Sequence, residues 1–194
     1  FSDMINLSKN LPWKVEAVCH KNKNLFELET SSDGKGRVVR IDGKRVPQSN
    51  LSSSLKIIWF LPPMDRIWME SSKDRRKFLD RMVYSLDSKH AKRCAQYEKL
   101  LRDRNKLLKD HIADSSWYLA IEKQMSILGF EIDSRRRDFI ENLNKALTED
   151  NLHFPAIKLK LKDEPIENNE VLFENLIHQR DKDLVSGRTN YGPH

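Results

Sequence analysis

The chain has 194 residues, of which 38% are hydrophobic and 33% charged, with six Gly and seven Pro. This composition excludes collagen-like and low-complexity sequence and leaves enough apolar material for one sizeable core or two small ones. With two cysteines, and no apolar run near the roughly 20 residues of a membrane span, the sequence predicts a soluble cytoplasmic protein without a disulfide framework.

The positive charge is concentrated in the middle of the chain. Residues 66–113 carry a net charge of +7, whereas residues 1–60 carry +4 and residues 114–194 carry −4. Because Lys and Arg contacts to phosphates dominate nucleic-acid affinity, a polyanionic partner is one interpretation. A solvated helix surface is the alternative.

The first third of the chain has the pattern of an antiparallel β-meander. Four short strands are expected, at residues 13–19, 25–30, 37–41 and 44–46. Asp42-Gly43 is a dipeptide typical of a tight hairpin turn. The nearly all-apolar run Leu55–Leu61 predicts a strand covered on both faces, which Pro62-Pro63 would end.

From residue 71 the spacing of apolar residues becomes helical. Ser71 and Asp74 have the spacing of a capping box at a helix start. Further helices are expected at about 88–109 and 118–146, with Gly129 as a candidate break. Their near-heptad spacing predicts long antiparallel helices. A strand is then expected at 157–161 and a short helix at 170–183, so the predicted fold is α+β.

The common catalytic and cofactor motifs are absent from the sequence. The nearest approach to a phosphate-binding loop is Gly43-Lys44, but Val38 takes the place of the first Gly and Arg45 follows the Lys. The six His have no H-x3-H partner and no Cys-x2-Cys pair exists. We therefore expect neither catalytic residues nor a metal site in this chain.

Three groups of residues carry a family-level signature. They are Trp59–Arg66 with Asp74–Arg81, then Tyr97–Lys109, then Ser186–Thr189 with Gly192–His194. In this order and spacing they resemble the RecF family of bacterial DNA replication and repair proteins. The strings Arg-Arg-x-Phe-Leu-Asp-Arg and Arg-x-Arg-Asn-x-Leu-Leu-Lys carry most of the likeness.

The resemblance implies that the chain is an internal fragment of an ATPase of the ATP-binding-cassette and SMC type. Residues 1–65 would be part of the antiparallel sheet of the ATPase head, 66–150 a helical arm lobe, and 151–194 the return to the head. The phosphate-binding loop would precede this sequence and the signature motif would follow it. The whole protein would use ATP and Mg²⁺, whereas no cofactor and no ATPase activity are expected for this chain alone.

The resemblance also implies the partners. Family members are expected to dimerise on DNA with ATP, at gaps or single-strand/double-strand junctions, and to act with the RecO and RecR proteins; no membrane is implied. Two other interpretations remain open: a self-standing helical module that binds protein or RNA, and an inactive truncated gene product.

Candidate DNA-binding residues lie on the two basic helices. They are Arg75, Arg76 and Arg81 on the first, and Lys92, Arg93, Lys99, Arg102, Lys106 and Lys109 on the second. The alternative for the first set is an ion-pair network in which Asp80 pairs with Arg76 or Arg81. The alternative for the second set is a solvated helical face.

Two connecting segments and one polar residue complete the candidates. Pro62, Pro63 and Asp65 would join the head to the arm. Related cassette ATPases often carry at this junction a Gln that senses the γ-phosphate, whereas this chain has Pro63. The alternative role for the segment is a rigid proline elbow that sets the geometry between head and arm. Arg188 and Thr189 would lie in a loop near the head interface or in a plain turn. Asn105 interrupts an apolar seam, which predicts a fixed helix register or a contact with the head.

Overall fold

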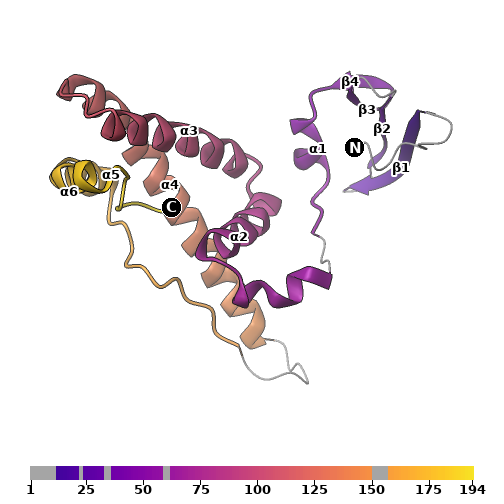
Figure 1. The fold of residues 1–194 in the computed structure, drawn as a ribbon. Helices are drawn as coiled ribbons and strands as arrows, with labels where there is room; N and C mark the ends of the chain where they lie inside the picture. The colour runs from indigo at the N-terminus through magenta and orange to yellow at the C-terminus, as the bar shows by residue number, and fades with distance from the viewer. Residues whose placement is uncertain (1–11, 22–23, 33–35, 59–61, 150–156) are drawn as a thin grey trace. The chain divides into compact units, whose positions relative to one another are not determined.

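The computed structural model describes residues 12–21, 24–32, 36–58, 62–149 and 157–194 (Figure 1). The chain divides into two compact units, Phe1–Ile57 and Ile58–His194.

The first unit contains a four-stranded antiparallel sheet whose strands follow one another in chain order. The strands are β1 (Trp13–Lys21), β2 (Asn24–Ser32), β3 (Arg37–Ile41) and β4 (Lys44–Val46). Asp42 and Gly43 form the turn between β3 and β4 with φ angles of 49° and 75°, the positive values that a tight hairpin requires. The predicted meander is confirmed.

The sheet has one apolar and one charged face because its side chains alternate. Leu28 and Val39 are buried on the same face, since Leu28 pairs with Ile41 and Val39 lies two residues before Ile41. On the other face Glu29 forms ion pairs with Lys14 and Arg40. The short helix α1 (Ser49–Ser54), which was not predicted from the sequence, follows β4.

The strand predicted for residues 55–61 is wrong over its described part. Residues 55–58 have no regular secondary structure, and residues 59–61 lie outside the described residues. The backbone N–H of Leu55 donates to the carbonyl of Leu51 and completes the last turn of α1, which ends because the backbone of Leu55 is extended (φ −131°, ψ 126°). Ile57 and Ile58 are 52% and 70% exposed. An apolar run forms a strand only where another strand is present to pair with it.

The second unit is helical. Its elements are the 3₁₀ helix η2 (Pro62–Met69) and the α-helices α2 (Ser72–Leu86), α3 (His90–Lys109), α4 (Ser115–Glu149), α5 (Asn169–His178) and α6 (Arg180–Ser186). Ser71 caps α2 as predicted, since its side chain accepts a hydrogen bond from the backbone N–H of Asp74 at 3.2 Å. The short link between α3 and α4 makes them an antiparallel hairpin (Figure 1).

The core of the helical unit lies where α5 packs against this hairpin. It consists of Tyr97, Met125, Ile132, Leu172 and Leu176. A smaller cluster near the hairpin turn contains Leu107, Leu108 and Tyr118. None of the helices in the described part of the chain is long and apolar enough to cross a membrane.

Gly129 does not break α4, which is one continuous helix of 35 residues. A Cβ atom at Gly129 would lie 2.7 Å from Cδ2 of Leu172 and 3.2 Å from a ring carbon of Tyr97. The glycine therefore permits the close approach of α5 and α3 to α4. An interior glycine costs a helix only about 1 kcal/mol, which the packing of α4 outweighs.

Gly129→Ala should lower the melting temperature of the helical unit, although Ala favours helix by about 1 kcal/mol. The added methyl group overpacks the core against a fully buried Leu172, which typically costs about 1–3 kcal/mol. Thermal unfolding followed by circular dichroism measures the change. Asn142→Ala, at an exposed position of the same helix, should be neutral or stabilising. A rise in melting temperature for Gly129→Ala would contradict the packing argument.

The strand predicted at 157–161 is also wrong, because this segment has no regular secondary structure. The N–H of Leu159 donates to Oδ1 of Asn144 at 2.8 Å, and its carbonyl accepts from Nδ2 of Asn144 at 2.9 Å. A side-chain amide on α4 thus takes the place of a neighbouring strand. The helix predicted at 170–183 is present as α5 and α6, with a one-residue interruption at Gln179.

Candidate nucleic-acid interface

Five basic residues of α3 lie on one face of the helix: Lys92, Lys99, Arg102, Lys106 and Lys109. Their spacing of seven, three, four and three residues places them within an arc of about 100° along about 25 Å of helix. All five are exposed. None takes part in the ion pairs found among the described residues, whereas many other basic side chains of the helical unit do. We call these five residues the α3 basic stripe.

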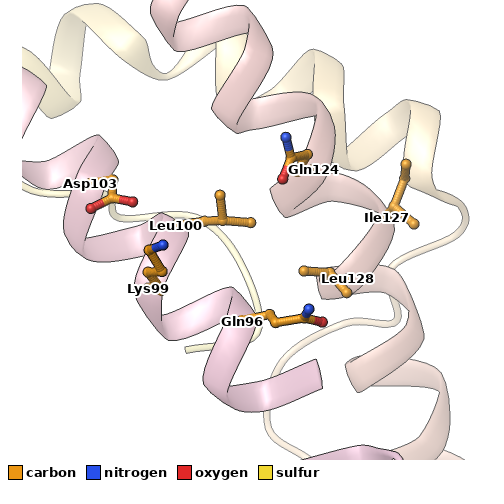
Figure 2. Close-up of a pocket in the computed structure, with 7 residues that line it drawn as sticks. All are labelled: Gln96, Lys99, Leu100, Asp103, Gln124, Ile127 and Leu128. Atoms are coloured by element: carbon orange, nitrogen blue, oxygen red, sulfur yellow. The ribbon is translucent and has the colours of Figure 1, made fainter. Parts of the chain in front are cut away.

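An open groove of about 420 Å³ runs beside the stripe, between α3 and α4 (Figure 2). Its lining consists of Gln96, Lys99, Leu100 and Asp103 from α3 and Gln124, Ile127 and Leu128 from α4. Lys99 therefore belongs to both the stripe and the groove. None of the seven lining residues is aromatic, so the groove offers no platform on which a base could stack.

Arg93 differs from the other basic candidates on α3. It forms ion pairs with Asp87 at 2.6 Å and with Glu131 at 2.5 Å, and its side chain is 16% exposed. Burial acts to lower its pKa, but the two carboxylates outweigh burial and raise it above the usual value. The geometry gives Arg93 a structural role, in which it ties the start of α3 to α4.

The three arginine candidates of α2 are partly buried. Arg75 donates to the backbone carbonyl of Glu70, and Nη1 of Arg81 lies 3.9 Å from the sulfur of Met64. Burial, followed by the positive charge of Arg136, lowers the pKa of Arg76. The arginines of α2 are thus less accessible to a phosphate than the α3 basic stripe.

The sequence predicted an ion pair between Asp80 and Arg76 or Arg81, but in the structure Asp80 pairs with Arg136. Arg136 of α4 binds both carboxylate oxygens of Asp80, each at 2.8 Å, and Nε2 of His90 lies 2.8 Å from Oδ1. Burial acts to raise the pKa of Asp80, but His90 and Arg136 together bring it below its usual value. Arg136 also donates to the carbonyl of Pro193, so this network joins α2, α3, α4 and the last loop.

One group of side chains has the composition of a metal site. Ligand atoms of Asp80, His90 and Cys94 lie within 4.8 Å of one another. However, Arg136 already occupies both oxygens of Asp80. Burial also raises the pKa of the Cys94 thiol to about 12, which disfavours the thiolate that binds metals.

The hydrogen bonds of His90 also argue against a metal site at this cluster. A metal-binding His normally donates its second N–H to a partner, but Nδ1 of the buried His90 has no hydrogen-bond partner among the described residues. The geometry suits the tautomer of His90 in which the Nε2–H group donates a hydrogen bond to Asp80. The arrangement suits an ion-pair network rather than a cation site.

A second network, centred on Arg104, was not predicted. Arg104 has no exposed surface, and it donates to Glu122 at 3.0 Å, Asp183 at 2.7 Å, Thr189 Oγ1 at 2.8 Å and the carbonyl of Leu176 at 3.0 Å. A sequence signal for it exists, because position 104 falls on the apolar face of α3 between Tyr97 and Leu108. A charged residue on such a face is usually paired.

The network is closed by a second arginine. Arg180 of α6 donates to Oε2 of Glu122 at 2.6 Å and lies over the ring of Tyr118, 5.0 Å from its centre. Two arginines therefore face two carboxylates, those of Glu122 and Asp183, which balances the buried charge. The network joins α3, α4 and α6 in the helical unit.

The two loop candidates differ in exposure. Thr189 is 5% exposed, and its N–H and hydroxyl both donate to Oδ1 of Asn105, at 2.7 and 2.8 Å. Asn105 thus anchors the last loop to α3. The side chain of Arg188 is exposed. Pro62, Pro63 and Asp65 lie in η2, and their side chains are outside the described part.

Comparison with known proteins identifies relatives over most of the chain. No family model matches. The chain is 36% identical over 179 residues to the DNA replication and repair protein RecF of Rhizobium etli, covering 86% of this chain and 48% of that protein. It is 31% identical over 191 residues to RecF of Rickettsia prowazekii, covering 93% and 53%. The chain thus spans about half the length of the curated relatives it matches.

Solved structures agree on the fold. A structure of the recombination mediator protein RecF of the RecFOR pathway with ATPrS superposes with a TM-score of 0.78, covering 95% of this chain and 54% of that one at 20% identity. A structure of RecF with ATP gives a TM-score of 0.77, covering 100% and 56% at 22% identity. Together with the curated relatives, these matches confirm the resemblance to RecF and the α+β fold.

Proposed function

We propose that this chain is a segment of a RecF-type DNA replication and repair protein, and that the α3 basic stripe holds DNA by its phosphates. The observation that carries the proposal is the stripe itself, with five exposed cations on one helix face and no ion-pair partner among the described residues. The α2 candidates Arg75, Arg76 and Arg81 would add a smaller contribution because they are partly buried.

The chemistry of the stripe favours binding without sequence preference. Four of its five members are lysines, whose ammonium groups act as flexible point charges, and only Arg102 offers a planar fork. Phosphate contacts of this kind position a duplex and release counterions, but they do not read bases. The stripe would therefore hold the DNA backbone and leave any selection of gaps or junctions to other parts of the whole protein.

The rest of the proposal concerns the whole protein. Residues 1–65 would form part of the ATPase head, 66–150 the arm, and 151–194 the return, with Arg188 near the head. ATP with Mg²⁺, dimerisation on DNA and cooperation with RecO and RecR would need residues beyond this chain. Solved structures of RecF with ATP in the RecFOR pathway support the parts of this view that concern ATP and the RecO and RecR proteins. As a DNA repair protein it would act in the cytoplasm.

The salt dependence of binding tests the proposal. If the 194-residue chain binds a fluorescein-labelled duplex through four or five phosphates, log K should fall with log salt with a slope of about −4, at roughly −0.9 per contact. Two duplexes of unrelated sequence should give the same affinity. Anisotropy titrations at several salt concentrations measure both. A slope near zero, or a strong sequence preference, would contradict the proposal.

A further inference from the structure

The groove between α3 and α4 has the form of a helix-docking surface. Its lining residues recur at three- and four-residue spacing on two antiparallel helices, the arrangement into which a third helix packs. Leu100 and Leu128 pack against the core on their inner side, which gives the groove an apolar floor. Ile127 lies on its wall with 44% of its surface exposed (Figure 2).

Another face of the same hairpin already holds such a helix. There α5, only ten residues long, buries Leu172 and Leu176 completely against Tyr97, Met125 and Ile132. Met125 and Ile127 are two residues apart and therefore point to nearly opposite sides of α4. The hairpin thus binds a short helix on the Met125 side through two leucines four residues apart, and the groove on the Ile127 side is open.

The charges around the groove indicate what its occupant carries. Lys99 lines the groove, and Lys92 and Lys106 follow on the same side of α3, two turns before and after it. Asp103 is the acidic lining residue on α3, and the α4 wall contributes the neutral Gln124. A helix with carboxylates on the flank that faces α3 would complement this rim.

DNA is a poorer match for the groove itself. Its lining has no aromatic ring for an unstacked base, and three of its seven members are aliphatic. Phosphates gain nothing from contact with Leu100, Ile127 and Leu128, because burying charge against apolar side chains is unfavourable. The stripe and the groove therefore suit different ligands, although they share Lys99.

We propose that the α3/α4 groove docks a short amphipathic helix of a protein partner, with apolar residues toward Ile127 and acidic residues toward Lys99. The docked helix would lie along α3 and compete with DNA for Lys99. The proposal rests on the groove and not on the DNA-binding role of the stripe.

The test uses a defined peptide and the 194-residue chain. The probe is a fluorescein-labelled, Ala-rich helical peptide of about 16 residues, with Leu at i, i+4 and i+7 and Glu along one flank. Its anisotropy should rise to saturation on titration. Ile127→Gln should weaken binding at least about tenfold, because it removes the apolar contact at the groove wall.

Matched variants and a second peptide separate docking from simple charge attraction. Leu119→Gln replaces a residue of the same helix with similar exposure, 40%, that does not line the groove, and it should change the affinity less than about twofold. A peptide of the same composition with its leucines spread around the helix should bind poorly.

Three results of the peptide titrations would overturn the proposal: absence of saturable binding, equal losses for Ile127→Gln and Leu119→Gln, and full binding of the rearranged peptide. A fourth comes from DNA binding. If Ile127→Gln instead weakened duplex binding and left peptide binding unchanged, the groove would be part of the DNA interface and the docking proposal would be wrong.

Discussion

Replacement of Arg104 by Met should lower the free energy of unfolding of the helical unit by about 3–5 kcal/mol, the usual cost of removing one partner from a buried ion pair. Arg104 has no exposed surface and makes four hydrogen bonds, two of them to the buried carboxylates of Glu122 and Asp183. Met fills a similar volume, so the loss would come mainly from the uncompensated charge rather than from a cavity.

The measurement is urea unfolding followed by circular dichroism at the helix band. This signal reports mainly the helical unit, because the short α1 is the one helix described in Phe1–Ile57. Arg102→Met is the matched control. It removes an exposed cation two residues away, and surface changes of this kind usually stay within about 0.5 kcal/mol.

A double variant tests the physical reason. Arg180 can still pair with Glu122 when Arg104 is lost, but among the described residues the carboxylate of Asp183 keeps only the hydrogen bonds from Asn190. Arg104→Met combined with Asp183→Asn should therefore be more stable than Arg104→Met alone. If the double variant is less stable, or if Arg104→Met costs no more than its control, the buried pair does not hold α3 to α6.

Reversing three charges of the α3 basic stripe should weaken DNA binding by about 100-fold or more at low salt, because each reversal removes a phosphate contact and adds a repulsion. The variant is Lys99→Glu, Arg102→Glu and Lys106→Glu. The salt slope should also become shallower by about 3 units, about one for each lost contact. All three side chains are exposed, so the melting temperature should change little.

The control changes the net charge by the same amount elsewhere in the helical unit. Lys158, Lys160 and Lys162 are exposed and lie outside the stripe, and their reversal to Glu should reduce affinity less than about fivefold. Equal losses in the two triple variants would show that DNA senses only the overall charge. Cooperative loss of helix in the first variant would show that the stripe is structural.

Much of this structure could be predicted because it depends on interactions between residues that are close in the sequence. The β1–β4 hairpins follow from two-residue alternation and from Asp42-Gly43, and the start of α2 follows from Ser71 and Asp74. The exposure of the α3 basic stripe follows from helical periodicity, since Tyr97 and Leu108 mark the buried face. In each case the deciding contacts lie within a few residues.

Other features depend on residues far apart. Arg104 meets Asp183 across 79 positions, and Arg136 meets Asp80 across 56. In the sequence, Arg93 resembles the other DNA-binding candidates of α3. The folded hairpin places Glu131 of α4 beside it, and the resulting ion pair distinguishes Arg93 from the stripe. A basic residue has the same local pattern whether it is paired or free, so the sequence could not separate these arginines from the stripe.

Periodicity, turn chemistry and ordered strings of residues predicted the β1–β4 meander, the helices α2, α3 and α4, the helical segment that forms α5 and α6, the position of the basic stripe and the likeness to RecF. Contacts between distant parts of the chain were needed to show that residues 55–58 and 157–161 are not strands, that Gly129 is a packing contact, and which cations remain accessible. A helix closes its own backbone hydrogen bonds, whereas strands, buried charges and close contacts require partners that come from elsewhere in the chain.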